Sequence, residues 1–135
     1  MGLRLAFYST GPGEVACEYS APEHFQGYPG VVHGGIVASM LDETVGRAAM
    51  EGDSNRFMMT AKLEIRYRQP VPTGTPLRVV GRLVSRRGRV AHATGQIVLP
   101  DGMVAAEAQA MLVDLPDLPG QDQTLESLGW KVYPD

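Results

Sequence analysis

A chain of 135 residues, 44% hydrophobic and 20% charged, has the size of one domain with a full core and leaves little room for a second. Its net charge of −3 argues against a nucleic-acid partner, because phosphate backbones attract clustered positive charge. No apolar stretch approaches the ~20 residues needed to cross a bilayer, and residues 1–10 lack a signal-peptide pattern. We therefore expect a cytoplasmic protein with no membrane partner.

The first quarter of the chain predicts a hairpin followed by a long loop. Apolar and polar residues alternate over residues 3–7, and Gly and Pro at 11–13 separate them from a second short strand at 15–19. Cys17 lies in that second strand and is the single cysteine, so it forms no internal disulfide and its apolar neighbours predict a buried thiol. Residues 21–35 are rich in glycine and proline and predict a loop.

Residues 36 to about 51 predict one long helix, because they contain no proline, one glycine and apolar residues at helical spacing. The apolar stripe expected to face a sheet consists of Val37, Leu41, Thr44, Val45 and Ala48. Glu43 falls on the opposite, solvent side. Asp42 falls on a flank of small residues, where a partner could approach closely and where loss of water would favour its use as a general base.

Long strands are predicted after the helix. The clearest covers residues 58–69 and places Leu63, Ile65 and Tyr67 on one face, with Glu64, Arg66 and Arg68 on the other. Three further strands are expected at residues 77–85, 90–99 and 103–115.

The predicted order of elements is thus two strands, one long helix and four strands. Short connections imply an antiparallel sheet, and one helix covers only one of its faces. We predict an α+β domain at residues 1–115, with a six-stranded antiparallel sheet wrapped around one long helix. Residues 116–135 are expected to form a C-terminal extension, packed on this domain or trailing from it.

The pair Gly34-Gly35 immediately precedes the predicted helix. Backbone N–H groups at a helix start lack intrahelical acceptors and lie at the positive end of the macrodipole. Such a terminus can hold an anion or the developing oxyanion of an attacked carbonyl. A tight turn without function would explain two glycines equally well. Together with Asp42, two helical turns further on, they predict an electrophilic site and a carboxylate that can share one pocket.

Other catalytic motifs are missing from the sequence. It has no G-x-S-x-G, no Walker loop and no G-x-G-x-x-G. Its three histidines are scattered and its cysteine is single, so we expect no metal site and no cofactor.

The stretch from Gly30 to Glu43, GVVHGGIVASMLDE, closely resembles the HGG-x6-D signature of hotdog-fold acyl-CoA thioesterases of the phenylacetate-degradation and thioesterase-superfamily-member types. The resemblance continues through MTAKL at 59–63 and YRQPVP at 67–72 with Gly74, and it covers about residues 13–113. It implies the hotdog fold and an enzyme that hydrolyses acyl-CoA thioesters to a free acid and CoA.

The resemblance also implies catalytic roles for four residues. Asp42 matches the catalytic acid, which activates water or attacks the thioester carbonyl itself. Gly34 matches the glycine whose N–H polarises that carbonyl, and His33 matches the histidine that orients the loop and assists at the carbonyl. Thr60 matches a strand hydroxyl that helps to hold the water and comes from the other subunit's side of the site.

Substrate-binding residues are implied in the same way. Gln26 stands one residue before the position where some relatives carry asparagine, and Gly27 occupies that position. Arg66, Arg68 and Arg89 align with positions that touch CoA, and arginine pairs bidentately with phosphate. A solvated strand face and a basic turn would explain the same arginines. The residues that we expect to bind the substrate are Gly35, Gln26, Arg66, Arg68, Gly88 and Arg89.

Hotdog sites lie between subunits, so the resemblance implies a homodimer or a dimer of dimers (a homotetramer), with the Asp42 flank near the twofold axis. Two alternative functions stay open. A non-catalytic acyl-CoA sensor or carrier on the same fold would bind the thioester without turnover. A hotdog hydratase or dehydratase would pair a histidine with an acid, and no such pair is legible in the sequence.

Overall fold

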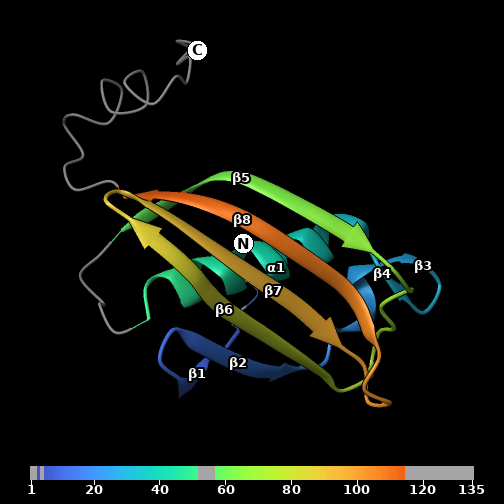
Figure 1. The fold of residues 1–135 in the computed structure, drawn as a ribbon. Coiled ribbons are helices and arrows are strands. Elements are labelled where there is room, and N and C mark those ends of the chain that lie inside the picture. Colours follow the sequence, from blue (N-terminus) through green and yellow to red (C-terminus); the bar gives the residue numbers. More distant parts are fainter. Residues whose placement is uncertain (1–2, 4, 52–56, 115–135) are drawn as a thin grey trace, which may run out of the picture.

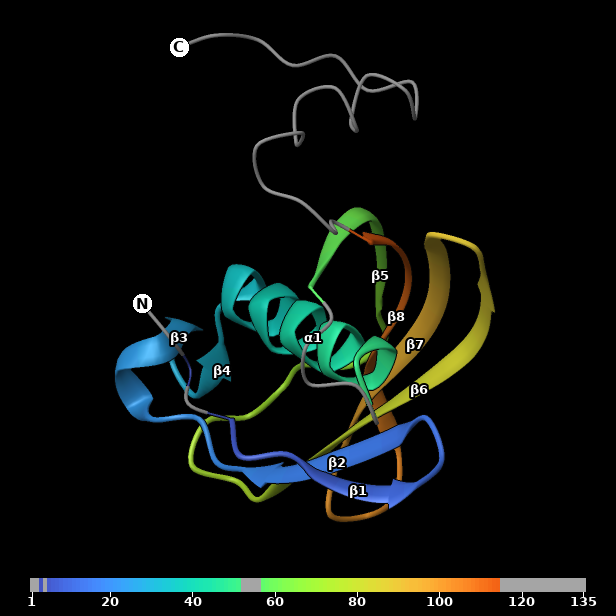
Figure 2. The same ribbon diagram turned by 90° about the vertical axis from the view of Figure 1, so that its left-hand side faces the viewer.

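The computed structural model describes residues 3, 5–51 and 57–114. Six strands form one antiparallel sheet in the order β1-β2-β6-β7-β8-β5, and a small hairpin, β3-β4, stands apart from it. The sheet curves around helix α1, which lies on its concave side (Figures 1 and 2). The elements are β1 (Tyr8–Gly11), β2 (Glu14–Tyr19), the 3₁₀ turn η1 (Glu23–Phe25), β3 (Gln26–Tyr28), β4 (Val31–Val32), α1 (Gly34–Ala49), β5 (Met58–Tyr67), β6 (Leu77–Arg87), β7 (Val90–Val98) and β8 (Val104–Asp114). This confirms the predicted six-stranded sheet with one long helix.

Two predictions of local structure were wrong. The first strand is Tyr8–Gly11 instead of residues 3–7, because Leu3 and Leu5 bury their side chains in the core without joining the sheet ladder. The predicted loop at 21–35 contains η1 and the β3-β4 hairpin, whose strands of three and two residues are too short to show a period. The expected C-terminal extension, 116–135, lies outside the described residues.

Helix α1 buries the apolar stripe that the sequence predicts. All five residues of the stripe are buried, and Met40 and Ala49 join them. Thr44 is fully buried, and its hydroxyl donates to the Met40 carbonyl at 2.6 Å, which satisfies the polar group within the helix. In the part of the chain that the structure covers, no helix has the length and apolar character needed to cross a membrane.

Two glycines at the centre of the sheet allow the helix to pack closely. Gly81 on β6 and Gly95 on β7 lie directly opposite each other in the ladder. A Cβ at Gly81 would lie 2.8 Å from Thr44 Cγ2 and 2.9 Å from the Thr44 carbonyl oxygen, and one at Gly95 would lie 3.3 Å from Val45 Cγ1. Because a backbone oxygen cannot move aside as a flexible side chain can, this pair sets how near the helix comes.

We expect Gly81→Ala to lower the free energy of unfolding by about 1–3 kcal/mol, because the added methyl group overpacks the contact with Thr44. The matched control is Arg82→Ala, since the Arg82 side chain is 71% exposed and makes only a 3.5 Å surface contact with Glu14. Its effect should stay within about 0.5 kcal/mol. Urea denaturation of both variants measures this, and equal loss in the two would refute the glycine's role.

Cys17 is fully buried, as predicted. Burial raises the pKa of its thiol from 9.0 to about 11, so at pH 8 the thiolate is on the order of one thousandth of the population. We expect Ellman's reagent to modify Cys17 only after a denaturant is added. Stoichiometric modification of the native protein within minutes would show that this expectation is wrong.

Candidate active site

His33 caps the start of helix α1. The ring atom Nδ1 of His33 accepts a hydrogen bond from the Gly35 N–H at 2.9 Å. The backbone N–H of His33 donates to the Phe25 carbonyl at 2.8 Å. Gly27 packs against it, because a Cβ there would lie 3.3 Å from His33 Cα. With Nδ1 as acceptor, the neutral imidazole carries its proton on Nε2. The cap explains why the helix begins at Gly34, two residues before the predicted start.

The N–H of Gly34 is the remaining open donor at this terminus. The N–H groups of Ile36 and Val37 both donate to the His33 carbonyl, and that of Gly35 is taken by the His33 ring. Within residues 3, 5–51 and 57–114, the Gly34 N–H makes no hydrogen bond. It therefore lies at the positive end of a 16-residue helix with its hydrogen available to an incoming oxygen.

Tyr67 also contacts this terminus, and it is not among the site residues that the sequence predicts. Its hydroxyl donates to the Gly34 carbonyl at 2.9 Å. The signal for it lay in the strand periodicity, which places Tyr67 on the same face as Leu63 and Ile65, and both of these pack against the core. Tyr67 is the last residue of β5 and faces the same side as these core residues, so it lies next to the start of the helix that covers this side of the sheet.

Asp42 and Thr60 form one hydrogen-bonded pair in one chain. Thr60 Oγ1 donates to Asp42 Oδ1 at 2.7 Å, and no other residue that the structure describes bonds to this carboxylate. The register of β5 shifts between Thr60 and Lys62, and this bulge turns Thr60 toward the helix. Within one chain Thr60 therefore lies beside Asp42, and the expectation that Thr60 comes from the other subunit's side of the site stays a prediction.

Asp42 and Gly34 line different pockets. A pocket of about 340 Å³ contains Asp42 and Thr60, and another of about 320 Å³ contains Gly34 and Tyr67. The two residues are eight positions apart in the helix, which corresponds to ~12 Å along its axis. The expected common pocket therefore does not form within one chain.

The Asp42 pocket combines a polar and an apolar side. Arg47 lies over the Phe7 ring, with its guanidinium carbon 5.7 Å from the ring centre. The residues that line the pocket are Leu5, Phe7, Asp42, Glu43, Gly46, Arg47, Met50, Met58 and Thr60.

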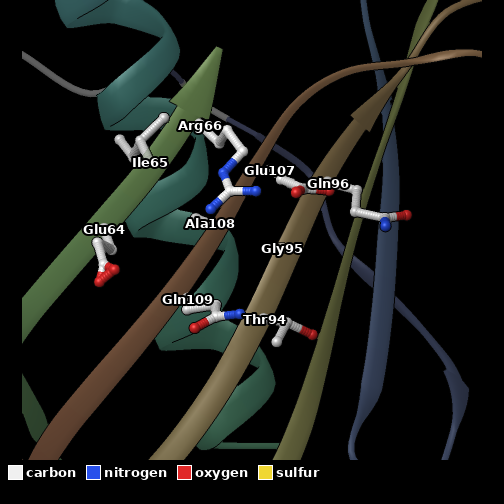
Figure 3. A pocket seen from close by; sticks show the side chains of 9 residues that line it. All are labelled: Glu64, Ile65, Arg66, Thr94, Gly95, Gln96, Glu107, Ala108 and Gln109. Carbon is white, nitrogen blue, oxygen red and sulfur yellow. The ribbon is translucent and has the colours of Figure 1, made fainter. Parts of the chain in front are cut away.

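The expected CoA-binding arginines Arg66, in β5, and Arg68, just after it, lie on the sheet face away from α1. Figure 3 shows Arg66 beside Glu107 on this face, in a pocket of about 440 Å³. Arg68 Nη2 lies 2.7 Å from Glu107 Oε1. Hydrogen bonding to Arg68 and the charges of Arg68 and Arg66 lower the pKa of Glu107, and the same bond raises the pKa of Arg68. In one chain Arg68 therefore pairs with a carboxylate, and Arg66 lies close enough for its charge to act on the same group.

Two of the other expected binding residues, Arg89 and Gln26, also have partners within the chain. Gly88 adopts φ +56° in the β6-β7 turn, and Arg89 Nη2 donates to the Asp114 carbonyl at 3.3 Å. Gln26 Oε1 accepts from the Gly30 N–H at 3.0 Å and so closes the β3-β4 turn. Across the described ranges, no group of three or more His, Cys, Asp or Glu side chains is placed to hold a metal ion.

Comparison with known proteins gives a consistent result. The family model described as "Thioesterase superfamily" matches residues 29–106. Acyl-coenzyme A thioesterase THEM4 of Rattus norvegicus is 33% identical over 122 residues, which is 88% of this chain and 52% of the relative. The dehydratase FabZ of Solibacter usitatus, which acts on 3-hydroxyacyl-[acyl-carrier-protein], is 32% identical over 92 residues, 65% of this chain and 56% of that protein.

A crystal structure of a thioesterase superfamily protein superposes with a TM-score of 0.74 at 34% identity, covering 81% of this chain and 55% of that one. The chain thus spans about half the length of each of these three proteins.

Proposed function

The chain belongs to the thioesterase superfamily, and from this membership we propose that it hydrolyses acyl-CoA thioesters to a free carboxylic acid and CoA. The observation that carries the proposal is the presence of both halves of such a site: a carboxylate held by a hydroxyl group, and an open N–H at a helix start. The relative named an acyl-coenzyme A thioesterase supports the choice of substrate.

In the proposed reaction the thioester oxygen accepts the Gly34 N–H, so that the negative charge of the tetrahedral intermediate develops at the positive end of α1. Thr60 holds one oxygen of Asp42 and leaves the other to act on a water molecule or on the carbonyl carbon. When water attacks, Asp42 takes its proton, the new C–O bond gives the tetrahedral intermediate, the C–S bond then breaks, and Asp42 returns the proton to the CoA thiolate. When Asp42 itself attacks, breakage of the C–S bond leaves an acyl–Asp42 anhydride, which water hydrolyses to the free acid and the restored carboxylate, and one proton of that water passes to the thiolate. His33 supports the site by holding the Gly35 N–H and thereby the start of the helix.

We propose that two copies complete each site, with Asp42 from one subunit and Gly34 from its partner. The ~12 Å between them within one helix is too far for both to reach one carbonyl. Strand β5 supports this arrangement because it is the last strand of the sheet, with Thr60 near one end and Tyr67 at the other. Antiparallel pairing of two β5 strands about a twofold axis would bring the Thr60 end of one beside the Tyr67 end of its partner.

The same proposal includes binding of CoA by six residues: Arg66, Arg68, Gly88, Arg89, Gly35 and Gln26. The phosphates of CoA are the ligands that arginine prefers. For Arg68, binding them requires exchange of its bond to Glu107 for one to phosphate.

We expect Asp42→Asn to lower kcat by about 10²–10⁴-fold while the fold is kept, because asparagine still accepts the Thr60 hydrogen bond but cannot take a proton. Asp101→Asn is the matched control, because Asp101 is an exposed aspartate in the β7-β8 turn whose Oδ1 accepts the Met103 N–H at 2.9 Å, a bond that asparagine can keep, and it should retain wild-type kinetics. Steady-state rates on short-chain, long-chain and aryl acyl-CoAs measure both. Comparable kcat/KM for Asp42→Asn and wild type would remove Asp42 from the mechanism, and stoichiometric binding without turnover by wild type would favour the sensor alternative.

A mixing experiment tests the shared site. Gly34→Ala should fold, because its Cβ would only reach ordinary contact with the Tyr67 hydroxyl at 3.8 Å, but the methyl group crowds the carbonyl position. Refolding an equal mixture of Asp42→Asn and Gly34→Ala chains should restore about one quarter of wild-type activity, since half of the dimers are mixed and each has one intact site. If both residues served one site within a chain, the mixture would stay as inactive as its parts.

The similarity to a dehydratase makes hydration of 2-enoyl-CoA a second candidate. The His33 ring bonds to the Gly35 N–H, and no carboxylate among the described residues pairs with it. Hydration measured beside hydrolysis on the same acyl chain decides between them, and we expect hydrolysis to be faster.

A further inference from the structure

We propose that Tyr67 is a positioning residue of this site: its hydroxyl group, bound to the Gly34 carbonyl, holds the start of α1 so that the Gly34 N–H points at the substrate carbonyl. This inference rests on the proposed function and adds to it a residue that touches the oxyanion donor's own backbone. The need for it comes from the two consecutive glycines, since glycine allows backbone conformations that other residues do not.

The peptide group between Gly34 and Gly35 is held at both ends by side chains. Its carbonyl oxygen accepts from Tyr67 at 2.9 Å, and its N–H donates to His33 Nδ1 at 2.9 Å. The preceding peptide group joins His33 to Gly34 and contains the Gly34 N–H, and its His33 carbonyl accepts from the N–H groups of Ile36 and Val37. Because each peptide group is planar, only the two torsion angles of Gly34 connect the two groups, and the bond to Tyr67 restrains these angles. The Gly34 N–H therefore has a defined direction.

Tyr67 is itself attached to a rigid part of the fold. It pairs with Ala106 of β8, and the N–H groups of the next two residues, Arg68 and Gln69, both donate to the Ala105 carbonyl at 2.8 and 3.0 Å. The hydroxyl therefore transmits the position of the sheet to the first turn of the helix. Both Tyr67 and Gly34 line the pocket of about 320 Å³ where a carbonyl could reach the donor.

Burial does not require this hydrogen bond. Tyr67 is 54% exposed, so water could satisfy its hydroxyl group, and phenylalanine would fit the same space. Folding does not need the hydrogen bond from the Tyr67 hydroxyl to the Gly34 carbonyl. Because this bond is made to the backbone of the oxyanion donor, it points to a role in the orientation of that donor. Misplacement of a reacting group by about 1 Å can cost on the order of 10²-fold in rate.

The test compares Tyr67→Phe with Tyr8→Phe. Tyr8 is a matched control because it is a strand tyrosine of similar exposure, 44%, whose hydroxyl donates one hydrogen bond to Glu18 at 2.7 Å, away from the proposed site. We expect Tyr67→Phe to lower kcat by about 10- to 100-fold with KM near the wild-type value, because the donor acts on the transition state. Tyr8→Phe should keep wild-type kcat and KM, and both variants should melt at similar temperatures.

A double-mutant cycle with His33→Ala adds a second measurement. Because His33 and Tyr67 hold the same peptide group, the loss of kcat in the double variant should be smaller than the product of the single losses. Independent effects that multiply would overturn the inference.

The remaining outcomes separate this inference from the proposed function. Turnover by wild type, with Tyr67→Phe as fast as Tyr8→Phe, would overturn the role of Tyr67 and leave the thioesterase proposal standing. A rise in KM with unchanged kcat would also overturn it, because it would make Tyr67 a ground-state contact. No turnover of any acyl-CoA by wild type would remove both proposals.

Discussion

Helix α1 reaches its place in the sheet because Gly81 and Gly95 leave no side chain beneath Thr44 and Val45. The two glycines lie opposite each other in neighbouring strands, so together they leave one shallow depression at the centre of the concave face. The close approach at this point contributes to the position of the helix against β5, where Asp42 meets Thr60 and Gly34 meets Tyr67.

Strand β5 connects the two chemical groups of the proposed site. It contacts the middle of α1 through Thr60 and Asp42, and the start of α1 through Tyr67 and Gly34. The same rigid strand thus orients the carboxylate and the oxyanion donor, although one chain keeps them ~12 Å apart. In the proposed twofold assembly, an edge strand with one half-site near each end would let the Asp42 end of one subunit meet the Gly34 end of the other.

The outer face of the sheet has its own electrostatics. Arg66 and Arg68 both lie near Glu107. Before any CoA binds, these two arginines, which the resemblance assigns to CoA, therefore interact with a carboxylate of their own chain. Such exposed pairs contribute little to folding, which leaves the arginines free to exchange partners at small cost. Phosphate binding here would therefore compete with Glu107 and weaken with salt.

The sequence by itself determined the features that depend on local period and local chemistry. These are the buried stripe of the helix, the strand positions after it and the buried Cys17, since a period of 3.6 or 2 can be read from neighbouring residues. The predicted difference between Asp42 and Glu43 did not appear in one chain, because both are exposed and line the same pocket. Only the tertiary structure decided that β5 pairs with β8 instead of the next strand in the chain, that a bulge turns Thr60 onto Asp42, and that Tyr67 reaches Gly34. Each of these depends on residues far apart in the chain whose register is set by packing against the helix, and no local pattern encodes that register.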